Sequence, residues 1–449
     1  MTAYSVPAAL RPGGWALEQT LSTRDGKLVA AASGPVTRLS GWAVPGMPNA
    51  HSHAFQRAMA GAAEHLDPTR PADSFWTWRD AMYRLANRIG PEEMEAVATQ
   101  LYAEMLEAGF TAVAEFHYLH HDRDGVPYAD PAEMSRALLR AAATAGIRIT
   151  LLPVFYAHGG FGQPLGADQR RFGHARVEDF ARLLDAARRA LGPGQQLGLA
   201  AHSLRAVSPS ELAELAALPG PIHIHIAEQP AEVAQCEASL GARPVAWLLD
   251  NLPVDGRWSL VHATHTTPAE VAAAAAAGAT AVICPTTEAN LGDGVFDLPT
   301  LLAANGHLAI GSDSHISVDP REELRLLEYG QRLTLLRRNV AASPTQPSTG
   351  QRLWCAAAAG GAQSLGAPLG ALADGCAADF VTLDPEHPRM LGHGPGSALD
   401  ALVFSASASA PVADVVVAGV RVVEEGRHVR RSEIAARFRA AMKRLQEQA

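Results

Sequence analysis

The feature that most constrains the fold of this chain is a series of short apolar segments, each separated from the next by residues with helical periodicity. These segments are Trp42–Val44, Thr111–Phe116, Ile147–Phe155, Leu197–Ala201, Ile222–Ile226, Ser259–Ala263, Thr280–Cys284 and Leu308–Gly311. They are predominantly apolar, as strands are when helices cover both faces of a parallel sheet. Eight strands that each lead into a crossover helix predict an α/β fold, a (β/α)8 TIM barrel.

The two ends of the chain have a different pattern. Residues 1–41 contain short alternating runs with turns between them, and Ala378–Asp384 and Val412–Val423 have the alternation of antiparallel strands. We therefore predict a barrel domain over 42–371, with a small composite β-sandwich domain built from 1–41 and 372–449. An amphipathic surface helix is expected over Ser432–Gln448.

Composition excludes several classes of protein. The 449 residues are 48% hydrophobic and 18% charged, which is ordinary for a globular protein. The net charge of -9 argues against nucleic acid or an anionic membrane as a partner. Alanine-rich runs such as Val271–Ala277 are too short to span a membrane. No secretory signal pattern is visible, and the four cysteines contain no Cys-x-x-Cys, so we expect reduced thiols in a cytoplasmic protein.

The first apolar run is followed by a His-x-His pair, His51 and His53. Side chains alternate between the two faces of a strand, so both imidazoles project to the same side and can bind one ion. The C-terminal ends of barrel strands are where metal and substrate sites collect. The alternative for either histidine is a hydrogen-bonded core residue.

Further candidate ligands stand at the ends of later strands. The fifth strand leads to His225 and Glu228, the sixth to His262 and the eighth to Asp313. Three imidazoles and one carboxylate suit zinc and leave a position for water, whose pKa the metal lowers. Beside that water, Glu228 and Asp313 form a natural general acid/base pair.

Each of these side chains has a structural alternative. Taken alone, Asp313 is a turn or helix-cap residue and Glu228 a solvated carboxylate at a helix start. Their occurrence together at several strand ends favours the metal site. We interpret His223 as a core residue, His265 as a cap of the next helix and Cys284 as a small buried apolar side chain.

The fourth apolar run limits the number of metal ions. A two-metal barrel site needs a bridging carboxylate, often a carbamylated lysine, near the middle of the strand set. Residues 197–203 contain no Lys, Asp or Glu. We therefore predict one ion per chain, zinc, with ferrous iron as the alternative.

Longer segments make the chain similar to the amidohydrolase superfamily and, within it, to the mononuclear zinc deaminases. The most specific of them are Phe55–Gly61 and Asp73–Arg79. The others are Pro45–His53, Ala114–His121, His202–Val207, His223–Gln229, Leu260–His265, Thr287–Gly294 and Ile310–His315. In that branch the chain resembles the formimidoylglutamate deiminases, a family of bacterial histidine-degradation enzymes.

The resemblance implies a ligand set and a reaction. The implied metal ligands are His51, His53, His225 and Asp313, and Glu228, His262 and Asp313 are the implied catalytic residues. The implied substrate contacts are Gln56, Arg79, Tyr118, His202 and Arg205. The implied reaction is hydrolysis of N-formimidoyl-L-glutamate to N-formyl-L-glutamate and ammonia. This substrate has two carboxylates and a cationic amidine, which require fixed positive groups on one side and carboxylates near the metal.

Two other functions stay open at this point. One is another deaminase of the same branch, such as a guanine deaminase, whose flat uncharged substrate does not call for two arginines. The other is a non-catalytic barrel that serves as a scaffold, although every ligand is present. The roles of Glu288 and Asn290, after the seventh strand, are left open. We expect a small dicarboxylate as the binding partner and a homodimer as the assembly.

Overall fold

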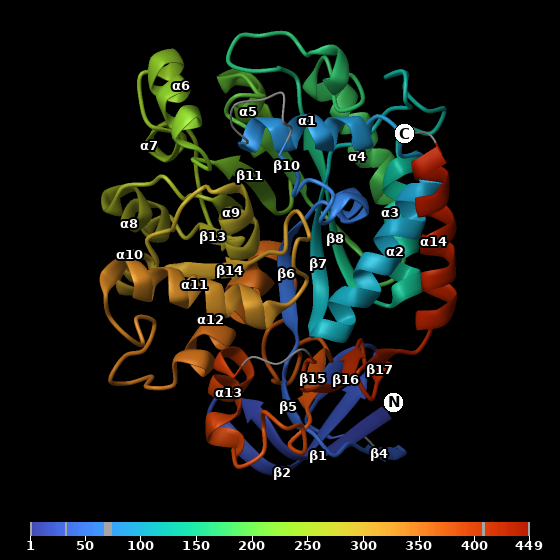
Figure 1. The fold of residues 1–449 in the computed structure, drawn as a ribbon, viewed down its shortest axis with the longest axis vertical. Helices are drawn as coiled ribbons and strands as arrows, with labels where there is room; N and C mark the ends of the chain where they lie inside the picture. Colours follow the sequence, from blue (N-terminus) through green and yellow to red (C-terminus); the bar gives the residue numbers. More distant parts are fainter. Residues whose placement is uncertain (1, 32–33, 67–73, 406–408, 448–449) are drawn as a thin grey trace.

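A computed structural model describes residues 2–31, 34–66, 74–405 and 409–447 of the chain. Its centre is a parallel sheet in the order β14-β13-β12-β11-β10-β8-β7-β6, with short β9 beside β8 (Figure 1). The strands are β6 Met47–Ser52, β7 Phe110–His117, β8 Arg148–Phe155, β9 Gln196–Leu197, β10 Leu199–Ser203, β11 Ile222–Ile226, β12 Trp258–His262, β13 Thr280–Ile283 and β14 His307–Ile310. A parallel bridge between Ser52 and Asp313 joins the two edge strands. The predicted barrel is confirmed.

Helices lie outside the strands, as Figure 1 shows. They are α1 Phe75–Ala86, α2 Pro91–Ala108, α3 Glu133–Ala145, α4 Val177–Ala190, α5 Pro209–Ala216, α6 Pro230–Leu240, α7 Pro244–Asn251, α8 Pro268–Ala276, α9 Pro285–Leu291, α10 Leu298–Ala303, α11 Pro320–Leu335 and α12 Thr349–Leu365. Short 3-10 helices are η1 Ala54–Met59, η2 Ala167–Gln169 and η3 Pro395–Ser397. Many of the α-helices begin with proline, which lacks the N–H that a first helical turn leaves unpaired. Every residue of β7, β11 and β12 is buried, since the barrel interior and the helices cover both faces.

The two ends of the chain combine, as expected, in one mixed nine-stranded sheet in the order β18-β17-β16-β15-β5-β1-β2-β3, with β4 paired to β1. Its strands are β1 Thr2–Arg11, β2 Gly14–Arg24, β3 Lys27–Val29, β4 Val36–Arg38, β5 Trp42–Pro45, β15 Phe380–Leu383, β16 Val412–Val417, β17 Val420–Glu424 and β18 Arg427–His428. The sheet has an apolar core of its own, which includes Tyr4, Leu21 and Phe380. The division into domains at residues 41 and 371 stays a prediction.

Two helices accompany the terminal sheet, α13 Ala398–Phe404 and α14 Arg431–Glu447. Helix α14, red in Figure 1, returns along the barrel and lies beside α2. The predicted helix over Ser432–Gln448 is present up to Glu447, and Gln448 lies outside the described residues.

The prediction that Trp42–Val44 is the first barrel strand is wrong. This segment is β5, which pairs with β15 and β1 in the terminal sheet. At Gly46 the chain passes from β5 into β6, the first barrel strand. Only glycine fits there, because the Cβ atom of any other residue would lie 2.3 Å from the side chain of Thr111. The true first strand contains Asn49, His51 and Ser52, so the apolar pattern selected its neighbour β5 instead. The pairing partner of β5 lies near the other end of the chain.

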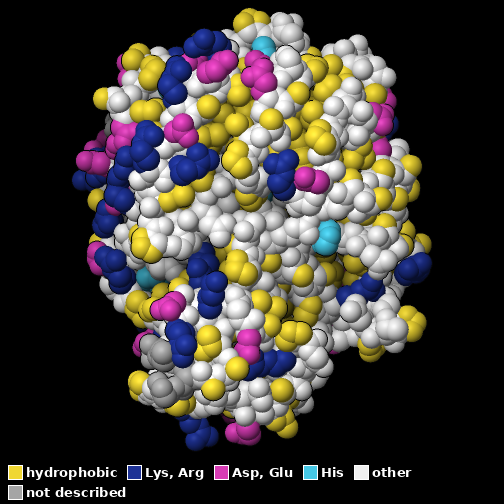
Figure 2. Space-filling view, turned by 180° about the vertical axis from the view of Figure 1, so that it is seen from behind, with side chains coloured by type: hydrophobic (Ala, Val, Ile, Leu, Met, Phe, Trp, Pro, Cys, Tyr) yellow, Lys and Arg dark blue, Asp and Glu magenta, His cyan; other side chains and the backbone are white. Residues whose placement is uncertain are grey.

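The surface is mixed in charge. On the face opposite to that of Figure 1, Figure 2 shows basic and acidic side chains close to one another and apolar side chains spread among them. Among the described residues, the search for a helix with the length and hydropathy needed to cross a bilayer finds none.

Candidate active site

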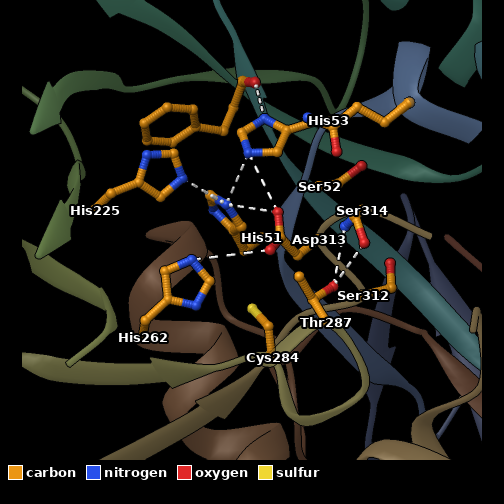
Figure 3. Close-up of polar contacts among 12 residues, drawn as sticks. His51, Ser52, His53, His225, His262, Cys284, Thr287, Ser312, Asp313 and Ser314 are labelled. Atoms are coloured by element: carbon orange, nitrogen blue, oxygen red, sulfur yellow. Dashed lines mark hydrogen bonds and ion pairs between the residues drawn. The ribbon is translucent and has the colours of Figure 1, made fainter. Parts of the chain in front are cut away.

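Three imidazoles and one carboxylate converge at the end of the barrel where β6, β11 and β14 finish (Figure 3). The Nε2 atom of His51 lies 3.1 Å from that of His53 and 3.0 Å from that of His225. Asp313 Oδ1 lies 3.4 Å from His51 Nε2 and 3.3 Å from His53 Nε2. In tetrahedral zinc sites, with Zn–N bonds of about 2.0–2.1 Å, neighbouring ligand atoms are about 3.3 Å apart. The four side chains therefore fit a single ion of that kind.

The backbone brings these residues together by closing the barrel. The amide of Asp313 donates to the carbonyl of His51 (3.0 Å), and the amide of His53 donates to the carbonyl of Asp313 (3.3 Å). Asp313 has φ 44° and His262 has φ 69°, values that side chains other than glycine seldom adopt. Such strain persists where the surrounding structure holds the backbone in place, and it concentrates at functional sites.

Burial favours the protonation states that bind metal. It lowers the pKa of His51 to about 3 and also lowers the pKa of His53 and of His225. Burial alone would raise the pKa of Asp313, but the neighbouring histidines, His51 first, lower it on balance. The Nδ1–H of His53 donates to the carbonyl of Phe116 (2.9 Å), which turns its Nε2 lone pair toward the cluster. Neutral imidazoles and an ionised carboxylate are the ligand forms that a divalent ion needs.

A second pair of groups stands beside the cluster. Glu228 Oε1 lies 3.7 Å from His262 Nε2, and the same nitrogen lies 3.8 Å from Asp313 Oδ2. Burial raises the pKa of Glu228 to about 7, close to where a general acid/base works best at neutral pH. Glu232 fixes this stretch of chain by accepting hydrogen bonds from the amides of Glu228 (3.0 Å) and Ala227 (3.2 Å).

The five predicted substrate contacts line one pocket together with Glu228, His262, Asp313 and two of the histidines of the cluster. They come from separate elements: Gln56 from η1, Arg79 from α1, Tyr118 from the residues after β7, His202 from β10 and Arg205 from the residues after β10. Gln56 Nε2 donates to the Tyr118 hydroxyl (3.0 Å), whereas its Oε1 is buried without a hydrogen-bond partner. Asp73, the first residue of one family-like segment, lies outside the described residues.

Aromatic rings flank both arginines. The Arg79 guanidinium carbon lies 4.6 Å from the centre of the Trp76 ring and 5.4 Å from that of Tyr83. The Arg205 guanidinium carbon lies 5.9 Å from the same Trp76 ring. Nε of each arginine is buried with no hydrogen-bond partner among the described residues. The pocket therefore contains two cations with donor capacity to spare, which suits a ligand with anionic groups.

Sequence reasoning missed the aromatic lining of this pocket: Phe75, Trp78, Tyr83, Tyr156 and Phe172. Three of these side chains belong to α1, whose Phe-Trp-Thr-Trp-Arg segment supported the family resemblance but gave only Arg79 as a substrate contact. The spacing of rings along that helix was the available signal, because residues three or four apart share one face.

The remaining histidines and Cys284 have structural partners. His223 Nε2 donates to the carbonyl of Ser364 (2.9 Å), away from the cluster. The interpretation of His265 as a cap of α8 is wrong, because its Nε2 instead donates to the carbonyl of Asp293 (2.8 Å). Thr267 caps that helix, since its side chain is the acceptor for the Glu270 amide. Cys284 is fully buried, as expected, and burial raises the pKa of its thiol.

Glu288 and Asn290, the two residues without an assigned role, have different surroundings in the structure. The Asn290 side-chain amide donates to Glu64 at the surface (2.7 Å). The Glu288 carboxylate is buried and accepts a hydrogen bond from His262 Nδ1 (3.2 Å). Another carboxylate, that of Asp293, lies close to Glu228 and His262, and one of its oxygens is buried without a partner among the described residues.

Comparison with known proteins gives a consistent result. A family model described as the amidohydrolase family matches residues 42–422. The chain is 52% identical over 439 residues to the formimidoylglutamate deiminase of Pseudomonas aeruginosa, covering 95% of this chain and 96% of that protein. The crystal structure of an amidohydrolase from Brucella melitensis matches with a TM-score of 0.93 at 47% identity. The match covers 99% of this chain and 100% of that protein. An adenosine deaminase from Xanthomonas campestris with bound zinc shares the fold, with a TM-score of 0.79 at 22% identity. That match covers 99% of this chain and 98% of the deaminase.

Proposed function

The chain belongs to the amidohydrolase family, and from that premise we propose that it hydrolyses N-formimidoyl-L-glutamate to N-formyl-L-glutamate and ammonia. The observation that carries the proposal is the pocket itself. It combines two arginines that have unpaired buried donors with a histidine–carboxylate cluster. A substrate with two carboxylates and one reactive amidine needs both parts.

The two ends of the substrate have different partners in this proposal. Its carboxylates bind Arg79 and Arg205, assisted by Gln56, Tyr118 and His202. Burial of a carboxylate requires a charged, preferably bidentate partner, which a guanidinium provides. Its cationic amidine then lies toward Glu228 and Asp313, which line the same pocket.

The proposed metal is zinc, one ion per chain, with ferrous iron as the alternative. His51, His53, His225 and Asp313 would hold it, a set whose spacing suits one tetrahedral ion. An ion held there would lower the pKa of a water molecule at the site, so that hydroxide would be available near neutral pH.

The side chains around the cluster handle the protons. Glu228 accepts a proton from the attacking water as the new C–O bond forms at the formimidoyl carbon, and it later delivers that proton to the departing nitrogen. The C–N bond then breaks and ammonia leaves. Asp313 and His262 orient the attacking oxygen and stabilise the tetrahedral intermediate. A pKa near 7 lets Glu228 serve in both directions.

The competing functions fit less well. A flat, uncharged nucleobase would leave Arg79 and Arg205 without a counter-charge in a buried pocket. A scaffold without catalytic activity would have no use for a cluster in which every ligand is intact.

Ammonia release tests the proposal. The purified protein, loaded with zinc, is incubated with N-formimidoyl-L-glutamate, with a formamidine that has no carboxylates, with guanine and with 5-methylthioadenosine. We expect rapid ammonia release from the first compound only, with N-formylglutamate identified as the product by mass spectrometry. Faster release from a nucleobase or nucleoside would overturn the proposal.

Three further parts of the proposal concern setting and assembly. We place the reaction in histidine degradation and in the cytoplasm, and the four cysteines, all free, are compatible with a reducing compartment. The homodimer stays a prediction, and light scattering tests it directly by measuring the molar mass of the purified protein in solution.

A further inference from the structure

Glu288 reaches His262 from the neighbouring βα unit. It lies on α9, which follows β13, whereas His262 is the last residue of β12. Its Oε1 accepts a hydrogen bond from His262 Nδ1 (3.2 Å) and another from the amide of Cys284 (2.8 Å). Both side chains are buried, His262 at 1% and Glu288 at 3% exposure, so water does not compete for these contacts.

This contact determines which ring nitrogen faces the reaction. A carboxylate accepts hydrogen bonds, so Nδ1 of His262 carries the hydrogen and points at Glu288. The other nitrogen, Nε2, then faces the gap between Glu228 Oε1 (3.7 Å) and Asp313 Oδ2 (3.8 Å). The ring also stacks on His225 with centroids 5.6 Å apart, which limits its tilt.

We propose that Glu288 is a positioning residue for the reaction: it holds the His262 imidazole so that Nε2 faces the reacting oxygen between Glu228 and Asp313. This inference rests on the proposed function, in which His262 stabilises the tetrahedral intermediate. Carboxylate–histidine pairs of this kind fix ring orientation in other enzymes, and loss of the outer partner typically lowers activity by about 10–100-fold.

A purely structural role is the alternative. Because Glu288 also accepts from the amide of Cys284, the N-cap of α9, it could serve only to cap that helix. Glutamine keeps the shape of the side chain and the Oε1 acceptor for both Cys284 and His262, but it removes the negative charge that strengthens and orients the bond to His262. A loss of kcat in Glu288→Gln at an unchanged melting temperature therefore separates the positioning role from helix capping.

The chain contains a matched control. Glu323, on α11, is also buried and anchors the same helix α9 by accepting from the Thr286 amide (2.9 Å) and the Thr286 hydroxyl (2.6 Å). It does not line the pocket. Glu323→Gln thus perturbs the start of α9 without removing a partner of His262.

The first measurement compares kcat, KM, metal content and melting temperature of the two variants with those of the parent. We expect Glu288→Gln to lower kcat by about 10–100-fold, with KM within about threefold and metal content unchanged. Glu323→Gln should keep kcat near that of the parent. If Glu288→Gln also kept the parent kcat, the inference would be wrong.

A double-mutant cycle tests whether Glu288 acts through His262. His262→Asn is measured alone and together with Glu288→Gln. We expect the double variant to be no slower than His262→Asn, because the positioning residue then has nothing to position. Losses that multiply would show that Glu288 acts independently and would overturn the inference.

A crystal structure of Glu288→Gln adds a readout independent of activity. The His262 ring should occupy more than one orientation, and a single orientation like that of the parent would count against the proposal.

Failure of the proposed function is distinguishable from failure of this inference. If the parent protein releases ammonia from a different compound, the proposed substrate is wrong, and the same cycle is run on that compound. If the parent hydrolyses N-formimidoyl-L-glutamate but the kcat losses of the two single variants multiply in the double variant, the proposed substrate is right and the proposed role of Glu288 is wrong.

Discussion

Ser52 and Asp313 form the parallel bridge that joins the first and last strands of the barrel. The bridge brings Asp313 beside His51 and His53, so closure of the barrel and assembly of the ligand cluster are one structural event. The Ser52 hydroxyl also donates to buried Glu115 (2.6 Å), which accepts a further hydrogen bond from the Ala54 amide (2.6 Å). The residues on both sides of His53 are therefore tied to β7.

Metal binding should depend on this cluster and should stabilise the closed barrel. We expect about one divalent ion per chain by elemental analysis, and we expect His225→Ala to lose both metal and activity. Because the ion binds the folded chain and not the unfolded one, a chelator should lower the melting temperature of the parent more than that of His225→Ala. Two tightly held ions per chain would contradict a mononuclear site.

Glu228→Gln should separate metal binding from catalysis. Glutamine keeps the shape of the side chain but cannot accept the proton of the attacking water. We expect metal content to stay unchanged while turnover falls by roughly a hundredfold or more. Near-normal turnover of this variant would make Glu228 a bystander, and Asp313 would then be the next candidate for the proton acceptor.

Arg79→Met and Arg205→Met test the recognition of two carboxylates. Methionine keeps much of the side-chain bulk and removes the charge, so each variant should lose about 2–5 kcal/mol of transition-state binding, measured as kcat/KM. Metal content should not change. A formimidoyl substrate that lacks one carboxylate should be poor for the parent and should discriminate little between the parent and the variant. If both variants hydrolysed formimidoylglutamate like the parent, the dicarboxylate assignment would fail.

Trp76 should affect substrate binding through the two arginines. Its ring flanks both guanidinium groups, and each such contact is worth about 0.5–2 kcal/mol. We expect Trp76→Leu to raise KM by about 5–30-fold with kcat little changed, whereas Trp76→Phe, which keeps a ring face, should lose less. Equal effects of the two substitutions on KM would indicate lost bulk and not lost cation–π contact.

The attachment of α14 should weaken in acid. Glu93 on α2 accepts from Arg444 (2.8 Å), and Glu95 accepts from Arg437 (3.0 Å). Burial alone would raise the pKa of both glutamates, but hydrogen bonds lower it on balance. Those to Glu93 come from Arg444 and the Gly90 amide, and those to Glu95 come first from Arg140 on α3 and then from Arg437. A carboxyl group whose pKa is lowered by folding stabilises the folded state above its unfolded pKa, 4.5 here, and loses that contribution as the pH falls through the folded value.

Hydrogen-exchange protection of α14 measures this effect. Protection factors should fall between pH 7 and pH 3, mostly below pH 4.5, by more in α14 than in α12. A Glu93→Gln, Glu95→Gln double variant should show the lower protection already at pH 7. Equal protection of α14 in the parent and the double variant at pH 7 would contradict the prediction.

The sequence by itself determined the barrel and the candidate ligands, because both depend on local properties. A strand buried on both faces is predominantly apolar wherever it pairs, and a His-x-His pair on a strand faces one side whatever surrounds it. The C-terminal ends of parallel strands meet at one edge, so residues at or just beyond the ends of β6, β11, β12 and β14 were expected to converge, and they lie together in the structure.

Only the tertiary structure decided which partners these local elements meet. Trp42–Val44 has the composition of a barrel strand, yet it pairs with β15 near the other end of the chain. The position of Glu288 in the first turn of α9 is ordinary for a carboxylate, yet its oxygen contacts His262 in the neighbouring βα unit. Trp76 precedes Arg79 on one helix, but its approach to Arg205 depends on how α1 lies over the barrel. Such contacts join residues far apart in sequence, and the packing of the whole chain, not the propensity of either segment, selects them.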